Sequence, residues 1–206
     1  MRHSKRYFIF VSVILSLVLT TVSHAYMEHD DITQRWGVGA SFATSLSTSD
    51  ETNPAFSIGV NATYGIKDNI AVTLDVGYHE FGYEALGLNF GELEAVPLIF
   101  SLQWRYPFMM SQIPATVYGI TGLGAIFYDF DNEGSTGARN VDVDDAFAVR
   151  LGAGMDFFMD YNWVLNVEGS YTFSDTNVIL SNTDGSQMIS EDTDYWLLGG
   201  GVKYFF

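Results

Sequence analysis

The chain has 206 residues, of which 25 are acidic and only nine are lysine or arginine, so that its formal net charge at pH 7 is −16. A surface this acidic is not expected to hold nucleic acid or anionic lipid headgroups without bridging cations. Because the chain contains no cysteine, disulfides, thiol catalysis and cysteine-ligated metals are excluded.

The beginning of the chain has the features of a secretory leader. A basic start at residues 2–6 precedes an apolar run at residues 7–22, and Ser23-His24-Ala25 places small residues where a signal peptidase cleaves. We predict a signal peptide at residues 1–25. A retained membrane helix is the alternative, but the apolar run is short for a span and a cleavage site follows it. The acidic segment at residues 26–34 is expected to be periplasmic and mobile.

After the leader, apolar residues alternate with small or polar residues. Between Phe147 and Phe157, for example, every second residue is apolar, whereas the residues between them include Arg150 and Asp156. A period of two is that of a β-strand whose faces meet different surroundings. Both faces of residues 115–128 are apolar or glycine-rich, so the facing of that strand is left unassigned. We predict strands at residues 35–46, 55–66, 70–81, 92–106, 115–128, 146–158, 163–174 and 192–206.

The spacers between the eight predicted strands are alternately long and short. The short ones are residues 67–69, 107–114 and 159–162, and the long ones are residues 47–54, 82–91, 129–145 and 175–191. In outer-membrane barrels short turns lie in the periplasm and long loops lie outside. An even number of strands then places both termini in the periplasm.

The last predicted strand, residues 192–206, distinguishes a membrane barrel from a soluble sheet. Trp196, Tyr204 and Phe206 lie on one apolar face, which in water would leave apolar surface and a sheet edge exposed. A closed barrel in a membrane pairs the edge and covers that face with lipid. A soluble ligand-binding barrel is therefore disfavoured. The sequence predicts an all-β protein, an eight-stranded antiparallel up-and-down transmembrane β-barrel at residues 35–206, after a cleaved signal peptide.

Two stretches resemble a known family. The hairpin RLGAGMDFFMDYNWVLNVEGSYTF and the terminal GGGVKYFF are similar to the small eight-stranded outer-membrane barrels of the OmpA, OmpX and OmpW type, and the resemblance covers essentially the whole chain after the leader. It implies a monomer in the outer membrane of a Gram-negative cell, in contact with outer-membrane lipid and lipopolysaccharide. It also implies that Phe206 helps the barrel assembly machinery to recognise the chain end.

Six charged residues fall on the predicted inner face of the barrel. The interior of an eight-stranded barrel is only wide enough for side chains to fill it, and isolated charges there would be costly, so opposite charges should pair. We predict an ion network that plugs the lumen. The alternative is a set of pairs that open transiently and pass small solutes. The six residues are Asp75, Arg105, Arg150, Asp156, Glu168 and Lys203.

Aromatic residues cluster near the ends of the predicted strands. We interpret them as two girdles at the membrane interfaces, which are structural and not a ligand cage. Trp196 would belong to the outer girdle. The periplasmic girdle would include Trp36, Trp104, Trp163, Tyr204 and Phe206.

Acidic residues crowd the predicted long loops. A solvated acidic rim is one interpretation. The other is a divalent-cation site, since clustered carboxylates suit hard cations. Asp142, Asp144 and Asp145 are the best local candidates, although they lack the spacing of an EF-hand loop.

Catalysis has little support in the sequence. After the leader the only histidines are His29 and His79, and no local motif places a serine beside His79. We expect His79 to be a rim residue, and we expect no enzyme activity and no cofactor. The leading hypothesis is a structural or surface-interaction role through the acidic outer loops. The alternative is a narrow channel for small or hydrophobic solutes.

Overall fold

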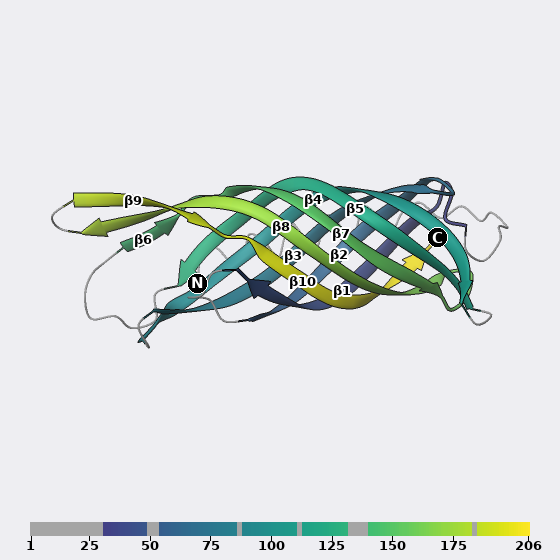
Figure 1. The fold of residues 1–206 in the computed structure, drawn as a ribbon, viewed down its shortest axis with the longest axis horizontal. Coiled ribbons are helices and arrows are strands. Elements are labelled where there is room, and N and C mark those ends of the chain that lie inside the picture. The colour runs from purple at the N-terminus through teal and green to yellow at the C-terminus, as the bar shows by residue number, and fades with distance from the viewer. Residues whose placement is uncertain (1–30, 49–53, 86–87, 111–112, 132–139, 183–184) are drawn as a thin grey trace.

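This computed structural model describes residues 31–48, 54–85, 88–110, 113–131, 140–182 and 185–206. These residues contain ten β-strands (Figure 1). They are β1 (Trp36–Ser47), β2 (Ala55–Lys67), β3 (Ile70–Ala85), β4 (Leu88–Met110), β5 (Ile113–Asp131), β6 (Asn140–Val143), β7 (Ala146–Phe158), β8 (Trp163–Asn182), β9 (Gly185–Asp192) and β10 (Tyr195–Phe205). Within these residues there is no helix of the length and apolarity that a membrane-spanning helix needs. The predicted signal peptide lies outside the described residues.

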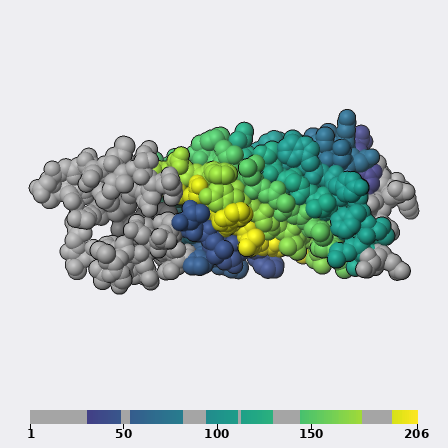
Figure 2. Space-filling model, viewed as in Figure 1, coloured from purple at the N-terminus to yellow at the C-terminus, as the bar shows by residue number. Residues whose placement is uncertain are grey.

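Eight of these strands close into an antiparallel barrel. Each strand from β1 to β5 pairs with the next, and the ladder continues through β7, β8 and β10. The closing strand β10 returns to β1, from Gly37↔Phe205 to Ser47↔Tyr195. In the space-filling view the yellow residues of β10 lie between green and blue neighbours (Figure 2). The closed wall leaves no open sheet edge for lipid to contact, and the predicted fold class is confirmed.

The strands run further than the predicted ones at both ends of the barrel. Residues 82–91 and 175–191 are largely strand, where long loops were expected, and β6 lies within the expected loop 129–145. Residues 107–114, expected as a short connection, continue the β4–β5 ladder to Met110↔Ile113. We expected each strand to end where the apolar alternation stops. Backbone pairing does not require apolar alternation, because polar residues form the same ladder in water.

A small sheet projects from one end of the barrel. Beyond the barrel wall β8 continues to Asn182 and pairs with β9 on one side and with β6 on the other. Figure 1 shows these segments reaching past the other strands at the end of the molecule opposite to the C-terminus. The longest connections of the chain are therefore partly ordered as sheet.

The two faces of the wall differ in the way that the alternation predicted. Phe56, Phe100 and Phe147 are exposed on the outside, where lipid would cover them. The facing of β5, left open by the sequence, is now assigned: Thr116 and Tyr118 are buried in the interior, whereas Leu123 is exposed.

Apolar side chains pack together at the end of the barrel that holds the C-terminus. Ile32, from the segment before β1, is buried in a cluster with Ala71, Phe158, Val164 and Phe205. The same segment forms a bridge from Thr33 to Gly65. The segment 26–34 was expected to be mobile, but its described part, residues 31–34, is anchored at the barrel end by the buried Ile32 side chain. Residues 26–30 lie outside the described residues.

Candidate functional site

One carboxylate in the lumen lies between two cations. Asp156 on β7 contacts Arg105 on β4 (Nη2 to Oδ2, 2.8 Å) and Lys203 on β10 (Nζ to Oδ1, 3.0 Å). All three side chains are buried, with at most 5% of each exposed. Asn166 Nδ2 also donates to Asp156 Oδ1, over 2.9 Å. This central cluster, with Asp156 at its centre, joins β4, β7, β8 and β10 across the interior.

A second cluster is centred on Arg150 of β7. Its guanidinium contacts the carboxylate of Glu168 on β8 and lies 3.5 Å from Asp75 Oδ2 on β3. Nε of Arg150 donates to Ser170 Oγ over 3.0 Å. The Asp75 side chain is 28% exposed, which makes it the most accessible of the lumen charges. Together the two clusters hold three cations and three carboxylates, so their formal charges balance.

The two clusters are joined by uncharged side chains. The Tyr118 hydroxyl donates to Glu168 Oε2 over 3.0 Å and accepts a hydrogen bond from Asn166, which also contacts Asp156. The Tyr118 ring fills the space above Gly154, where a Cβ atom would overlap it. The six charged residues selected from the sequence therefore lie together. Tyr118 was missed because the facing of its strand was unassigned, and Asn166 because it carries no charge.

His79 is not the rim residue that the sequence suggested. It is buried in the interior, and Oγ of Ser45 and of Ser57 lie 2.7 and 2.6 Å from its Nδ1. Its ring packs 5.2 Å from that of Tyr195 and 6.0 Å from that of Phe81. The serines are remote in sequence, but β1, β2 and β3 are adjacent and Ser57 pairs directly with His79. The inward phase of the three strands was the signal that could have revealed this cluster.

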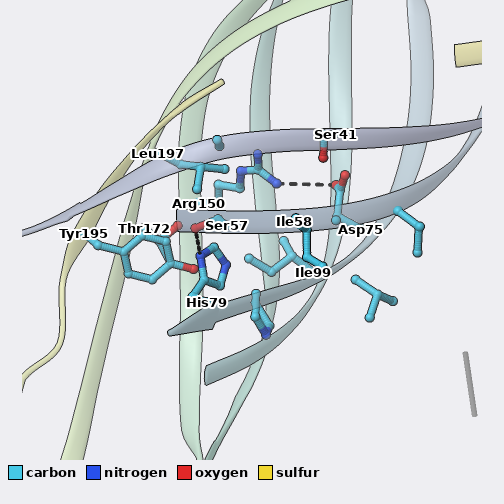
Figure 3. Close-up of a pocket in the computed structure, with 16 residues that line it drawn as sticks. Ser41, Ser57, Ile58, Asp75, His79, Ile99, Arg150, Thr172, Tyr195 and Leu197 are labelled. Carbon is cyan, nitrogen blue, oxygen red and sulfur yellow. Dashed lines mark hydrogen bonds and ion pairs between the residues drawn. The ribbon is translucent and has the colours of Figure 1, made fainter. Parts of the chain in front are cut away.

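A cavity of about 50 Å³ lies between the His79 cluster and the Arg150 cluster, with room for a few water molecules. Figure 3 shows His79 and Ser57 on one side of it and the Arg150–Asp75 ion pair on another. Pro97 also lines it, where the β3–β4 ladder breaks between Val76↔Leu98 and His79↔Ala95. Proline has no N–H to donate to a ladder, so the pairing of the wall is interrupted beside the cavity.

Arg35 connects the segment before β1 to the last residues of the described chain. It is buried, and it stacks 4.0 Å from the centre of the Tyr161 ring. Burial lowers the pKa of its guanidinium from the ordinary value, and Tyr161 and Asp31 oppose that shift. Its nitrogens donate to four backbone oxygens, those of Asp31 (3.2 Å), Tyr161 (2.7 Å), Phe205 (3.2 Å) and Phe206 (3.4 Å).

The aromatic residues selected from the sequence lie on the outer wall. Trp36, Trp104, Trp163 and Trp196 are each between 45% and 50% exposed. Three of these tryptophans pack against tyrosines, and Phe206 packs against Tyr204. The ring-centre distances are 4.8 Å for Trp36–Tyr64, 5.0 Å for Trp163–Tyr204, 4.8 Å for Trp196–Tyr171 and 5.2 Å for Tyr204–Phe206.

The three acidic residues proposed as a cation site lie at the end of the barrel opposite to the C-terminus. Asp142 belongs to β6 and pairs through its backbone with Ile179, while Asp144 and Asp145 are exposed just before β7. Among the described residues, no three histidine or carboxylate side chains converge closely enough to hold a metal ion.

Comparison with known proteins shows what this architecture resembles. The model of the outer membrane protein beta-barrel domain family matches residues 13–206, and no curated protein matches the sequence significantly. The outer membrane protein OprG from Pseudomonas aeruginosa has a similar structure, with a TM-score of 0.71 and 16% identity over 87% of this chain and 99% of that one.

Two further solved structures have the same fold. For the outer membrane protein AlkL in DMPC lipid bilayers the TM-score is 0.63, with 19% identity over 91% of this chain and 97% of that one. For the E. coli Outer Membrane Protein W the TM-score is 0.55, with 20% identity over 84% of this chain and 98% of that one. At these identities the likeness concerns the fold alone.

Proposed function

We infer the function from one premise, that the chain belongs to the outer membrane protein β-barrel domain family and lies among the lipids and lipopolysaccharide of a Gram-negative outer membrane. We propose that its lumen is closed along the barrel axis and that its role is structural or interactive, exerted at the cell surface. The observation that carries this proposal is Asp156, held between Arg105 and Lys203 with almost no exposure. Separating such ions would leave buried charges unpaired.

Packing above and below the ions supports a closed lumen. Ile32 and Phe205 fill the end near the C-terminus. Near the other end, Phe81 and Tyr195 belong to a second buried apolar cluster. A solute that moved along the barrel axis would have to displace both apolar clusters and also the ion-paired side chains of the lumen.

The surface role rests on the projecting sheet and on its charge. Strands β6, β8 and β9 extend beyond the barrel, and the sequence of residues 129–145 and 175–194 is strongly acidic. Carboxylates attract divalent cations, which also bind the phosphates of lipopolysaccharide. We propose that the acidic outer loops, Asp142, Asp144 and Asp145 among them, contact lipopolysaccharide through such bridging cations.

Deletion of residues 129–145 tests the surface role. The shortened protein should still migrate as a heat-modifiable barrel on a gel, because the β5–β7 ladder ends at Ile126↔Ala146 and does not include these residues. Its Mg²⁺-dependent binding of lipopolysaccharide should fall to the level that the intact protein shows in EDTA. Unchanged binding by a folded deletion variant would refute the role of these loops.

The orientation and processing of the chain belong to the same proposal. We place both termini in the periplasm, which the short connections at the end of the barrel near the C-terminus support, and we propose cleavage before Tyr26. Intact cells should therefore protect a C-terminal tag from added protease. The mass of the purified protein should be that of a chain that begins at Tyr26.

A second function is favoured by the broken β3–β4 ladder beside the cavity. In this alternative, small or hydrophobic solutes pass between the cavity and the lipid through the wall at Pro97. Pro97→Val restores a backbone donor there and should lower solute uptake by proteoliposomes. Pro107→Val, in the same strand but away from the break, is the matched control. Equal uptake by both variants and the unchanged protein would remove this alternative.

A further inference from the structure

The periplasmic end of the β4–β5 hairpin extends beyond both of its neighbours. β3 pairs with β4 no further than Trp104, and β7 pairs with β5 no further than Ala115. The two strands nevertheless remain paired to each other as far as Met110↔Ile113. We call residues 106–110 together with 113–114 the hairpin tip.

The hairpin tip is apolar and uncovered. Tyr106 is 71% exposed, Met109 64%, Met110 50% and Ile113 45%. The chain contains no charged residue between Arg105 and Asp129. The other two short turns differ, since Lys67 and Asp68 are exposed in one and Asp160 is exposed in the other. Charged side chains of those turns are favourable in water, whereas exposure of the apolar hairpin tip to water is unfavourable.

The tip continues the surface that meets lipid. On the outer face of β4, Phe100 and Trp104 are exposed one after the other toward the tip, and Tyr106 follows in the same phase. Tryptophan and tyrosine mark the level of the lipid headgroups, so the tip begins at that level. A soluble partner could reach only the few side chains of the tip itself, because the wall above them is in lipid.

We propose that the hairpin tip lies in the headgroup region of the inner, phospholipid leaflet and anchors this side of the barrel there. The proposal rests on the periplasmic placement of the short turns. Phe108, Met109, Met110 and Ile113 provide the apolar contact. Because the other two short turns carry exposed charges, the anchorage is confined to the β4–β5 side of the barrel.

Single cysteines can test this directly, because the chain has none of its own. Met110→Cys and Ile113→Cys would each carry an environment-sensitive fluorophore on the full-length mature chain, folded into phosphatidylcholine vesicles. Asp68→Cys is the control for a solvated turn. Leu123→Cys, on the outer face of β5, is the control for a position deep in the membrane. Heat-modifiable migration on a gel establishes that each variant is folded, and two tip positions guard against the failure of one.

The expected result is a blue-shifted emission from both tip labels. Lipids with a nitroxide near the headgroup should quench them, and aqueous iodide should not, whereas the label at position 68 should show the reverse. Iodide quenching at the tip equal to that at position 68 would overturn the proposal. Protection from both quenchers would overturn it too, and would indicate a second copy as the occupant. If deep nitroxides quench the label at position 123, the barrel has inserted into the membrane. Absence of quenching of the tip labels by headgroup nitroxides in that same preparation would then count against this proposal alone.

Discussion

At the scale of single residues, the Asp156 ion pairs are the most deeply buried charges of the lumen. Asp156 is fully buried and uses its two oxygens for two different cations, Arg105 and Lys203. Neither cation has a second acidic partner among the ion pairs of the described residues. Asp156 therefore holds more of the network together than any other carboxylate.

Replacing Asp156 by asparagine should destabilise the barrel strongly. Two buried cations would lose their counter-ion, which typically costs about 3–5 kcal/mol. Lys203→Met should be milder, since Asp156 would keep Arg105, and the exposed Asp145→Asn should have almost no effect. Urea unfolding of the three variants in vesicles would measure the differences. Equal stability of Asp156→Asn and Asp145→Asn would show that the central cluster contributes nothing.

The second prediction concerns the Ser57–His79 contact, whose geometry resembles part of a hydrolase site. We predict that it is structural, because Ser57 is 3% and His79 4% exposed and the ring is packed between aromatic residues. A fluorophosphonate probe should not label the folded protein, and His79→Ala should lower its stability. Labelling at Ser57 that disappears in the His79→Ala variant would instead reveal an activated serine.

At the scale of whole elements, the seam between β1 and β10 decides whether the sheet closes. Arg35 lies at this seam and contacts the backbone of the segment before β1, of the turn after β7 and of the chain end. Asn162 adds a hydrogen bond from Nδ2 to the carbonyl of Phe205, over 2.6 Å. The C-terminal residues, which we propose are read by the assembly machinery, are thus held once the barrel has closed.

Arg35→Ala should loosen this seam without changing the fold. Loss of charge-assisted hydrogen bonds to buried carbonyls should cost roughly 2–3 kcal/mol. Arg35→Lys should recover only part of it, because an ammonium cannot span several acceptors as a planar guanidinium does. Carboxypeptidase digestion in vesicles should release Phe206 faster from Arg35→Ala than from the control Lys67→Ala. Equal release rates would contradict the role of Arg35.

The sequence predicted the strands better than their ends. Apolar alternation sets the phase of a strand, so the inward facing of Asp156 and Lys203 followed from their neighbours. It does not set where backbone pairing stops, which is why β8 and β9 run on where a loop was expected. Contacts between remote segments, such as Ser57 with His79 or Arg35 with Phe205, depend on closure and register. These appear only once the barrel is formed.

At the scale of the whole molecule, the closed lumen that we propose rests on three sets of buried side chains. Apolar residues pack around Ile32 near one end and around Phe81 and Tyr195 near the other, and the two ion clusters also lie in the interior. The β3–β4 ladder is interrupted between Val76↔Leu98 and His79↔Ala95. In the function that we propose, the molecule offers its surfaces to lipid and to the cell exterior while its lumen stays closed.

The most direct test of this account is the ionic current through the folded protein in a planar bilayer. The account predicts no steady current for the unchanged chain at neutral pH, because the Arg105–Asp156–Lys203 cluster spans the lumen. A steady, ohmic current that persists as long as the protein remains heat-modifiable, and that is altered by Asp156→Asn, would show that ions pass through the lumen and would contradict it.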